Sequence, residues 1–382
     1  MLVVRALLTA RVFSTSYSVT HSLTKPLYGS FGATCRNTIV RGQMSSARAE
    51  IHCSAASCPG LSIVSGLSAL IADYDAVLLD QFGVLHDGKQ PMPGAIECFE
   101  QLAAAGKRLI VLSNTSRRRQ FALSKFPKLG FDGRMLAGFV CSGEQAWQHI
   151  KRHRSGQRVL WLSWAEDFQA WDPNYLNGLD LLLAPASEAD FVLCHGSMVI
   201  RDGRESMPTE LLESGVPSVA LLEALRECNK RRLPMICANP DLQVVLPSGN
   251  LGHMPGVIAQ LYEQLGGTVI YFGKPHASAF DEALQLLGPQ TPPSRVLHVG
   301  DSVAHDIAGA SQAGIHSLFI ASGIHADELG IADGGSADTS VLVSDGDEPN
   351  AGLNAALTTE ALEKLFSAYN TGPTHTMRAF VW

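Results

Sequence analysis

Short apolar runs that each end in a polar residue constrain the fold of this chain more than any other feature. Ala76 to Leu79 is one such run, and it stops at Asp80. Short continuous apolar runs are typical of strands that are buried on both faces of a parallel sheet. The same pattern returns at three places, namely 108–112 before Ser113, 269–272 before Gly273 and Lys274, and 296–299 before Gly300 and Asp301.

Helical segments alternate with these strands. Pro93 suits a first helical turn and Gly106 suits a helix end, so we expect a helix at 93–105. Repeated strand–helix units predict an α/β fold with a doubly wound parallel sheet. In such sheets, ligands bind beyond the carboxyl ends of the strands. The other units that we expect are helices at 277–287 and 304–313 and a strand at 315–320.

A long insertion separates Ser113 from Lys274. It spans about 160 residues and carries strand and helix patterns of its own, for example at 158–162 and 220–228. A segment of that length is better explained as an inserted α/β domain than as a loop. We therefore expect a core domain formed by 73–117 plus 268–370 and an inserted domain formed by 118–267.

The first 60 residues have the composition of a targeting segment. No Asp or Glu occurs before Glu50, while Arg5 and Arg11 lie in an otherwise apolar stretch that could form an amphipathic helix. Such a composition, rich in Arg and Ser and poor in acids, is typical of organelle transit peptides. A leader without a targeting role is the alternative. We expect a mitochondrial or chloroplast protein, and the amphipathic stretch favours the mitochondrion.

Composition excludes several classes of function. The net charge of −7 and the absence of a long basic stripe after residue 50 argue against nucleic-acid binding. No apolar run reaches the ~18–20 residues that a membrane span requires. The eight cysteines contain no CxxC pair, so we expect reduced, buried thiols and no zinc site.

The polar residues at the strand ends suit phosphoryl chemistry. A carboxylate such as Asp80 can attack phosphorus and form an acyl-phosphate, and Gly83 permits a tight turn after it. The hydroxyl of Ser113 and the backbone N–H of Asn114 could hold a phosphate at a helix start. Lys274 could neutralise the phosphate and the charge that develops during transfer.

A metal site is expected next to Asp80. Asp301 lies at a strand end, and Asp306 lies about one turn into the next helix. Hard carboxylate donors suit Mg²⁺, which also keeps waters and binds phosphate oxygens. His305 is expected to be a neighbour and not a ligand, because imidazole suits Mg²⁺ poorly.

Taken in chain order, Asp80, Ser113-Asn114, Lys274 and Gly300-Asp301 with Asp306 resemble the four motifs of the haloacid dehalogenase-like superfamily. The position of the insertion resembles class IIA members, which carry a C2-type cap there. Class IIA signatures are also similar to three segments of this chain, namely 83–88, 239–241 and 273–275. The resemblance implies a Rossmann-like core and a phosphatase-like hydrolase with Asp80 as nucleophile. It further implies that Asp80, the backbone carbonyl of Phe82 and Asp301 hold Mg²⁺ with support from Asp306, and that Ser113 and Lys274 bind the phosphoryl group.

Phe82 departs from this pattern. Phosphatases of the superfamily usually carry a second Asp two residues after the nucleophile, where it handles the proton of the leaving group. Phe82 cannot do so, and general acid–base catalysis is worth roughly 10²–10⁴-fold. Three explanations stay open. The protein is a phosphatase that uses a substitute acid, such as His86 or Asp87, or a substrate whose leaving group needs no proton. Alternatively, it is a 2-haloacid dehalogenase, or a non-catalytic protein that binds phosphorylated metabolites.

The position of the insertion disfavours the dehalogenase, because dehalogenases that resemble this chain carry their cap between the first two motifs. The expected ligand is a small phosphorylated metabolite whose identity the cap determines. Asn239 and Asp241 follow a predicted strand, so they either bind this substrate or only form a turn. A homodimer through the cap is a further expectation.

Overall fold

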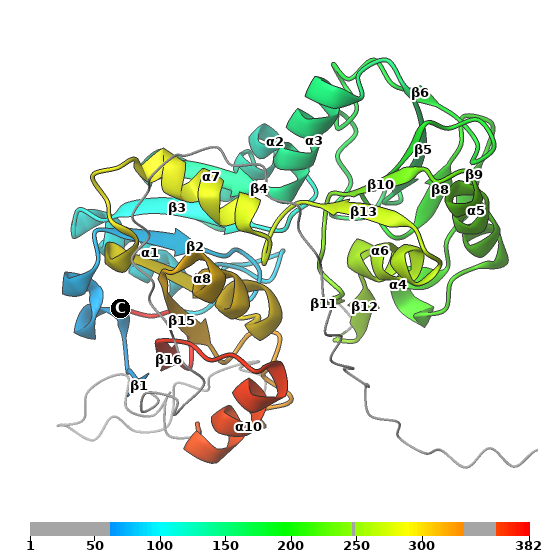
Figure 1. The fold of residues 1–382 in the computed structure, drawn as a ribbon. Helices are drawn as coiled ribbons and strands as arrows, with labels where there is room; N and C mark the ends of the chain where they lie inside the picture. The colour runs from blue at the N-terminus through cyan, green and yellow to red at the C-terminus, as the bar shows by residue number, and fades with distance from the viewer. Residues whose placement is uncertain (1–61, 247–248, 332–356) are drawn as a thin grey trace, which may run out of the picture. The chain divides into compact units, whose positions relative to one another are not determined.

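The computed structural model describes residues 62–246, 249–331 and 357–382 (Figure 1). The expected leader at 1–60 lies outside these residues.

The core domain contains a seven-stranded sheet whose neighbouring strands all pair in parallel. Its order is β1 (Ser62–Ile63), β16 (His375–Met377), β15 (His316–Ile320), β14 (Val296–Gly300), β2 (Ala76–Leu79), β3 (Arg108–Ser113) and β4 (Leu136–Cys141). The parallel α/β core expected from the apolar runs is thereby confirmed. Leu79 pairs with Val299 on one side and with Val111 on the other. This register aligns the carboxyl ends of β2, β14 and β3.

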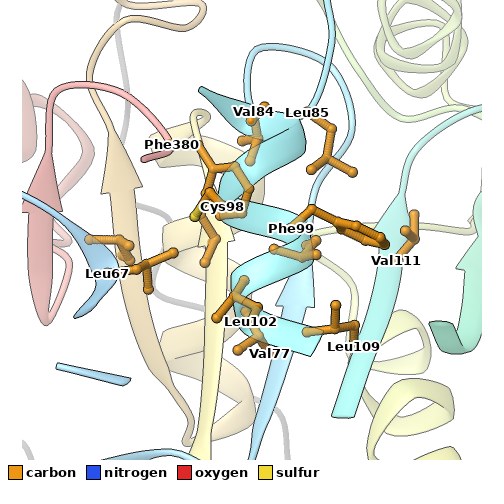
Figure 2. Packing of buried hydrophobic residues seen from close by; sticks show 14 of the residues in the cluster. Leu67, Val77, Val84, Leu85, Cys98, Phe99, Leu102, Leu109, Val111 and Phe380 are labelled. Carbon is orange, nitrogen blue, oxygen red and sulfur yellow. The ribbon is translucent and has the colours of Figure 1, made fainter. Parts of the chain in front are cut away.

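Helices cover both faces of the core sheet. On one face Val77 and Leu79 belong to the same buried cluster as Phe99 of α1 (Ala95–Ala104), which Figure 2 shows from close by. On the other face Leu78 shares a cluster with Phe280 of α7 (Ala277–Leu287) and with the short helix α8 (Ala308–Ala313). Alternate residues of one fully buried strand therefore pack in opposite directions, as a doubly wound sheet requires. The remaining core helices are α2 (Arg119–Leu123) and α10 (Thr359–Tyr369).

The inserted domain, called the cap below, contains a second sheet. Five of its strands, including the central β5 (Arg158–Ser163) and β7 (Phe191–Cys194), pair in parallel, whereas β8 (Val199–Arg201) runs antiparallel to β5. The other strands of this sheet are β6 (Leu182–Leu183), β9 (Ser206–Pro208), β10 (Pro234–Cys237) and β13 (Thr268–Tyr271). The nearby elements are α3 (Ser142–His153), α4 (Leu211–Ser214), α5 (Val219–Lys230), α6 (Pro255–Gln264) and the hairpin of β11 (Gln243–Val245) and β12 (Leu251–His253).

Sheet membership corrects the expected division of the chain in three places. β4 lies within the 118–267 segment that we assigned to the cap, yet it pairs with β3 in the core sheet. β13 lies within the expected core segment 268–370, yet it pairs with β10 in the cap sheet. The core also extends beyond 73–370, because β1 and β16 pair with each other at its edge. Each error concerns long-range pairing, which an apolar run does not specify.

One expectation about the described residues agrees with the structure. Cys98, Cys141, Cys194, Cys228 and Cys237 are all free and buried. Across 62–246, 249–331 and 357–382, no helix combines the length and apolar character that crossing a membrane would require.

Candidate active site

Three buried carboxylates meet at the carboxyl edge of the core sheet. Asp80 follows β2, Asp301 follows β14, and Asp306 lies in the π-helical turn Val303–Ile307. One oxygen from each of them lies within 4.8 Å of the others. An all-oxygen donor set of this kind fits a hard divalent cation such as Mg²⁺.

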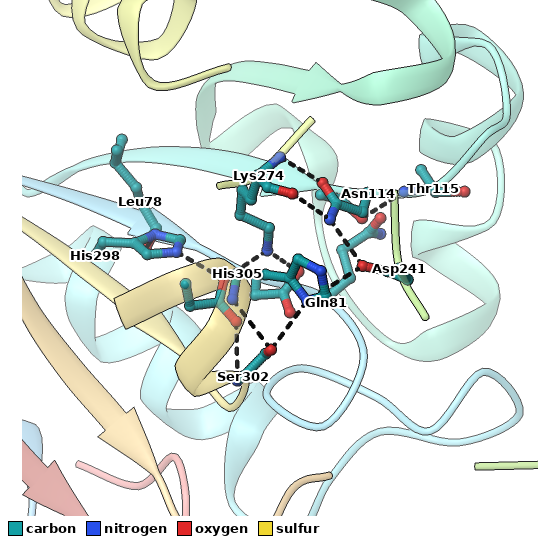
Figure 3. A network of polar contacts seen from close by, with 12 residues as sticks. Leu78, Gln81, Asn114, Thr115, Asp241, Lys274, His298, Ser302 and His305 are labelled. Atoms are coloured by element: carbon teal, nitrogen blue, oxygen red, sulfur yellow. Dashed lines mark hydrogen bonds and ion pairs between the residues drawn. The ribbon is translucent and has the colours of Figure 1, made fainter. Parts of the chain in front are cut away.

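Lys274 contacts two of these carboxylates, and Figure 3 shows its side chain within the polar network of the site. Its Nζ is 2.7 Å from Asp80 Oδ1 and 2.6 Å from Asp306 Oδ1, and its side chain is 2% exposed. The residue follows β13, which is a cap strand, and not a strand of the core sheet as we expected. The segment that leads back from the cap into the core therefore delivers the cation to the site.

One lysine cannot neutralise three carboxylates. Burial would raise the pKa of Asp306, but Lys274 and His298 outweigh it and hold this pKa well below its usual value. Burial raises the pKa of Asp80 to about 7, although Lys274 opposes the rise. Burial together with the neighbouring Asp80 and Asp306 raises the pKa of Asp301 well above its usual value. The site is therefore short of positive charge, and a divalent cation would supply it.

The backbone that follows Asp80 lies against Asp301. Asp301 Oδ2 accepts a hydrogen bond of 2.8 Å from the backbone N–H of Ile324. A Cβ on Gly83 would lie 1.9 Å from Asp301 Oδ2, and one on Gly323 would lie 2.1 Å from the same atom. Only glycine allows this approach, which brings the Gly83 backbone next to Asp301.

We expect Gly83→Ala to damage the metal site. Gly83 has φ +75°, so alanine there is strained by about 1–2 kcal/mol even before its Cβ meets Asp301. Gly106→Ala is the matched control, since Gly106 has φ +73° but open space around its Cβ position. Both variants should lose a similar amount of stability from strain, whereas only Gly83→Ala should weaken Mg²⁺ binding in titration calorimetry. Equal Mg²⁺ affinity in the two variants would contradict the assignment.

Asn114 connects the phosphate-binding segment expected after β3 to Lys274. Its Oδ1 accepts from the backbone N–H of Lys274 at 2.7 Å, and its Nδ2 donates to the Lys274 carbonyl at 3.0 Å. Ser113 is buried at the end of β3, where its Oγ accepts from the backbone N–H of Thr115 at 3.2 Å. The side chain of Asn114 thus positions the lysine, a role that we did not expect from the sequence.

Asp241 reaches the same network from the cap. Asn114 Nδ2 donates to Asp241 Oδ1 at 2.8 Å, and His305 Nδ1 lies 3.7 Å from that oxygen. Asn239 is buried, and its Oδ1 accepts from the backbone N–H of Asp241 at 2.9 Å. The structure therefore brings Asp241 to the site and uses the side chain of Asn239 to form the turn that carries it.

Phe82 and the two nearby candidate acids have other surroundings. The Phe82 ring packs edge-on against His86 with centroids 4.9 Å apart. His86 Nδ1 accepts from the backbone N–H of Gly88, and burial lowers the pKa of His86 to about 4. Asp87 Oδ1 accepts from two backbone N–H groups of its own turn, and the side chain is exposed. Within the described part of the chain, neither side chain forms a hydrogen bond or ion pair with Asp80, Asp301 or Asp306.

Two residues of the site were missed in the sequence. His298 is a fully buried residue of β14, and its Nε2 lies 2.8 Å from Asp306 Oδ1. The backbone N–H of Ser302 donates to Asp306 Oδ2 at 3.0 Å. A histidine in the middle of a buried apolar strand is unusual, so the sequence does contain a signal for His298. The Ser302 contact uses a backbone N–H, which does not depend on the residue type and therefore cannot be predicted from the sequence.

Two family models match the chain. Residues 77–171 match a model described as haloacid dehalogenase-like hydrolase, and residues 271–347 match one described as HAD-hydrolase-like. Chronophin of Homo sapiens is 24% identical over 269 residues, which cover 68% of this chain and 85% of that protein. Glycerol-3-phosphate phosphatase of Rattus norvegicus is 26% identical over 272 residues, covering 67% and 81% respectively.

Solved structures share the fold of both domains. A haloacid dehalogenase-like hydrolase from Brucella suis has a TM-score of 0.60 and 26% identity, over 83% of this chain and 99% of that one. The p-nitrophenyl phosphatase from Archaeoglobus fulgidus has a TM-score of 0.55 and 20% identity, over 80% and 97%, a likeness that shows the fold alone. With a segment on each side of its cap strands matched and its cap in the class IIA position, the chain belongs to the haloacid dehalogenase-like hydrolases and is a phosphatase-like enzyme of class IIA.

Proposed function

We propose that this protein is a Mg²⁺-dependent phosphatase that hydrolyses a small phosphorylated metabolite through an aspartyl-phosphate on Asp80. The contact that carries this proposal is the one between Lys274 and Asp80 at the edge where three carboxylates meet. Asp80 lies at the end of a rigid strand, and its backbone N–H donates to Val299 at 2.9 Å, so its carboxylate is held in place for attack.

The other site residues take roles that follow from their positions. Asp80, Asp301 and the Phe82 carbonyl would hold the metal with support from Asp306. When bound, Mg²⁺ would neutralise phosphate oxygens and the nucleophile. Ser113, the backbone N–H of Asn114 and Lys274 would hold the phosphoryl group. Asp80 Oδ then displaces the leaving oxygen from phosphorus, and water later releases phosphate from Asp80.

The substrate class rests on the relatives. Besides glycerol-3-phosphate phosphatase, a dihydroxyacetone phosphatase of Corynebacterium glutamicum is 30% identical over 92 residues. By their names, both relatives act on small phosphorylated compounds. We therefore place the substrate of this protein among small phosphate esters, with Asn239 and Asp241 on the cap side of the site.

The test is a panel of phosphorylated metabolites assayed with the purified full chain. Phosphate release should occur from at least one ester with Mg²⁺ present and should disappear with a chelator. Restoring Mg²⁺ should recover the rate, which separates metal dependence from damage to the protein. Release that persists in the chelator would contradict the metal assignment.

A non-catalytic role is the second candidate, and Phe82 is the observation that favours it. Such a protein would bind phosphate esters through Ser113, Asn114 and Lys274 without turnover. Ester binding in calorimetry without phosphate release from any panel member would establish this alternative. Chloride release from 2-haloacids would instead indicate a dehalogenase.

Two further properties belong to the proposal. Residues 1–60 would direct import into a mitochondrion or chloroplast, as their acid-poor composition suggests. Fusing them to a fluorescent protein would reveal the compartment.

The enzyme would form a homodimer through its cap, which carries exposed apolar side chains such as Leu182 and Val219. Light scattering of the purified chain would measure the mass.

A further inference from the structure

The absence of an acid at position 82 leaves a step of the proposed reaction without a proton donor. An alkoxide leaving group needs a proton as its bond to phosphorus breaks, and the attacking water must then lose one. The two nearby candidates are poorly suited. Asp87 is engaged by the backbone of its own turn, which holds its pKa below its usual value although burial opposes this. His86 is buried beside Phe82 with one ring nitrogen already accepting from Gly88.

Asp241 is a fourth carboxyl group near Asp80, Asp301 and Asp306. A single residue, Asn114, joins it to that group, since Asn114 Nδ2 donates both to Asp241 Oδ1 and to the Lys274 carbonyl. Lys274 Nζ in turn contacts Asp80. Figure 3 shows Asp241, Asn114, Lys274 and His305 in one connected network. The cap thus places a carboxyl group in the same polar network as the nucleophile.

The turn that carries Asp241 is held firmly. Asn239 Oδ1 accepts from the backbone N–H of Asp241, and the Asp241 carbonyl accepts from the backbone N–H of Gly256 at 3.0 Å. A Cβ on Gly256 would lie 2.2 Å from the Pro240 carbonyl oxygen, so α6 begins in direct contact with this turn. A fixed backbone keeps a proton-transfer group at a constant distance and orientation relative to the reacting atoms.

The Asp241 side chain is surrounded by protein but open to a ligand, with 28% of its surface exposed. Its ionisable neighbours are His305 and Asp306 from the turn after β14 and Lys274 from the segment after β13. Burial raises the pKa of Asp241, with His305, Asn114 and Lys274 opposing and Asp306 adding to the rise. A carboxyl group of this kind holds a proton more readily than an exposed aspartate does.

We propose that Asp241, supplied by the cap, is the proton-transfer residue of the Asp80 site. In the first step Asp80 bonds to phosphorus, the phosphorus–oxygen bond of the ester breaks, and the carboxyl proton of Asp241 passes to the leaving oxygen to give the free alcohol. In the second step the Asp241 carboxylate takes a proton from water, whose oxygen bonds to phosphorus as the bond to Asp80 breaks. Inorganic phosphate leaves, and both carboxyl groups return to their starting states. This inference rests on the proposed function.

Asp241→Asn tests this role through its dependence on the leaving group. We expect kcat/KM for an alkyl phosphate to fall by roughly 10²–10⁴-fold, the worth of general acid catalysis. For p-nitrophenyl phosphate, whose leaving group needs no proton, kcat/KM should fall by less than about 10-fold. Rapid-quench measurements should then show a burst of p-nitrophenol and an accumulated phosphoenzyme, because water is no longer activated.

Asp87→Asn is the matched control, since it removes the carboxylate of the competing candidate on the exposed turn. It should leave both substrates within about twofold of wild type. Equal losses on both substrates in Asp241→Asn would assign Asp241 to binding or structure and overturn the inference while the proposed function stands. A leaving-group-dependent loss in Asp87→Asn would overturn it as well. The alkyl phosphate is one that the wild-type chain hydrolyses in the panel, and if the chain releases phosphate from no panel member, the proposed function itself fails.

Discussion

Asp80→Asn should lower phosphate release on the order of 10⁶-fold, the loss seen when a hydrolase loses its nucleophile. The amide keeps the shape of the side chain, and its oxygen can still accept from Lys274, which contacts Asp80 Oδ1 at 2.7 Å. It cannot attack phosphorus to form an acyl-phosphate. The measurement is steady-state phosphate release with Mg²⁺, together with a search for phosphoenzyme by acid quench.

Asp75→Asn provides a control at the opposite end of the same strand. Asp75 precedes β2 and pairs with Arg295 at 2.6 Å on the surface, where an ion pair contributes little. Its activity should stay within about twofold of wild type. If Asp80→Asn retained more than about 1% of the wild-type rate, attack by Asp80 would be the wrong mechanism.

The local part of this fold could be predicted, and its long-range part could not. The runs before Asp80, Ser113 and Asp301 are strands of one parallel sheet, because a continuous apolar run with a polar end reports burial on two faces. The run at 269–272 has the same local pattern but pairs with β10 in the cap. Nothing within such a run specifies its partner, so the cap boundaries were wrong where partners decided them.

The same distinction between local patterns and long-range contacts applies to the candidate site. Carboxylates at strand ends were visible in the sequence, and the register of β2 with β14 brings Asp80 and Asp301 together. Asn239 and Asp241 were ambiguous because a turn and a binding role use the same residues, and in the structure Asn239 makes the turn while Asp241 contacts Asn114. That contact spans 127 positions in sequence, so no local pattern could have revealed it.

Lys274→Met should destabilise the metal-free protein by about 3–5 kcal/mol, because removing one partner of a buried ion pair leaves the other charge uncompensated. Lys274 is 2% exposed and contacts both Asp80 and Asp306. In the variant, three carboxylates within 4.8 Å of one another would lack their lysine. Mg²⁺ should recover part of the loss, since it would supply the missing charge. Lys107→Met is the control, because Lys107 donates to a backbone carbonyl, that of Tyr74, at 2.7 Å.

The deficit of Lys274→Met should grow with pH. Burial already raises the pKa of Asp80 to about 7 in the folded wild-type protein, and the pKa of Asp301 is raised as well. A carboxyl group whose folded pKa is raised stabilises the fold while it is protonated, and this stabilisation is lost as pH rises through the folded pKa. Without Lys274 the pKa values of these carboxyl groups should rise further. The free energy of unfolding of the variant should therefore be higher at acidic pH and lower at alkaline pH. Urea unfolding with a chelator at pH 5.5 and pH 8 measures both free energies. Lys107→Met should cost on the order of 1 kcal/mol at either pH, and a Lys274→Met deficit that shrank toward pH 8 would show that Lys274 does not compensate these carboxylates.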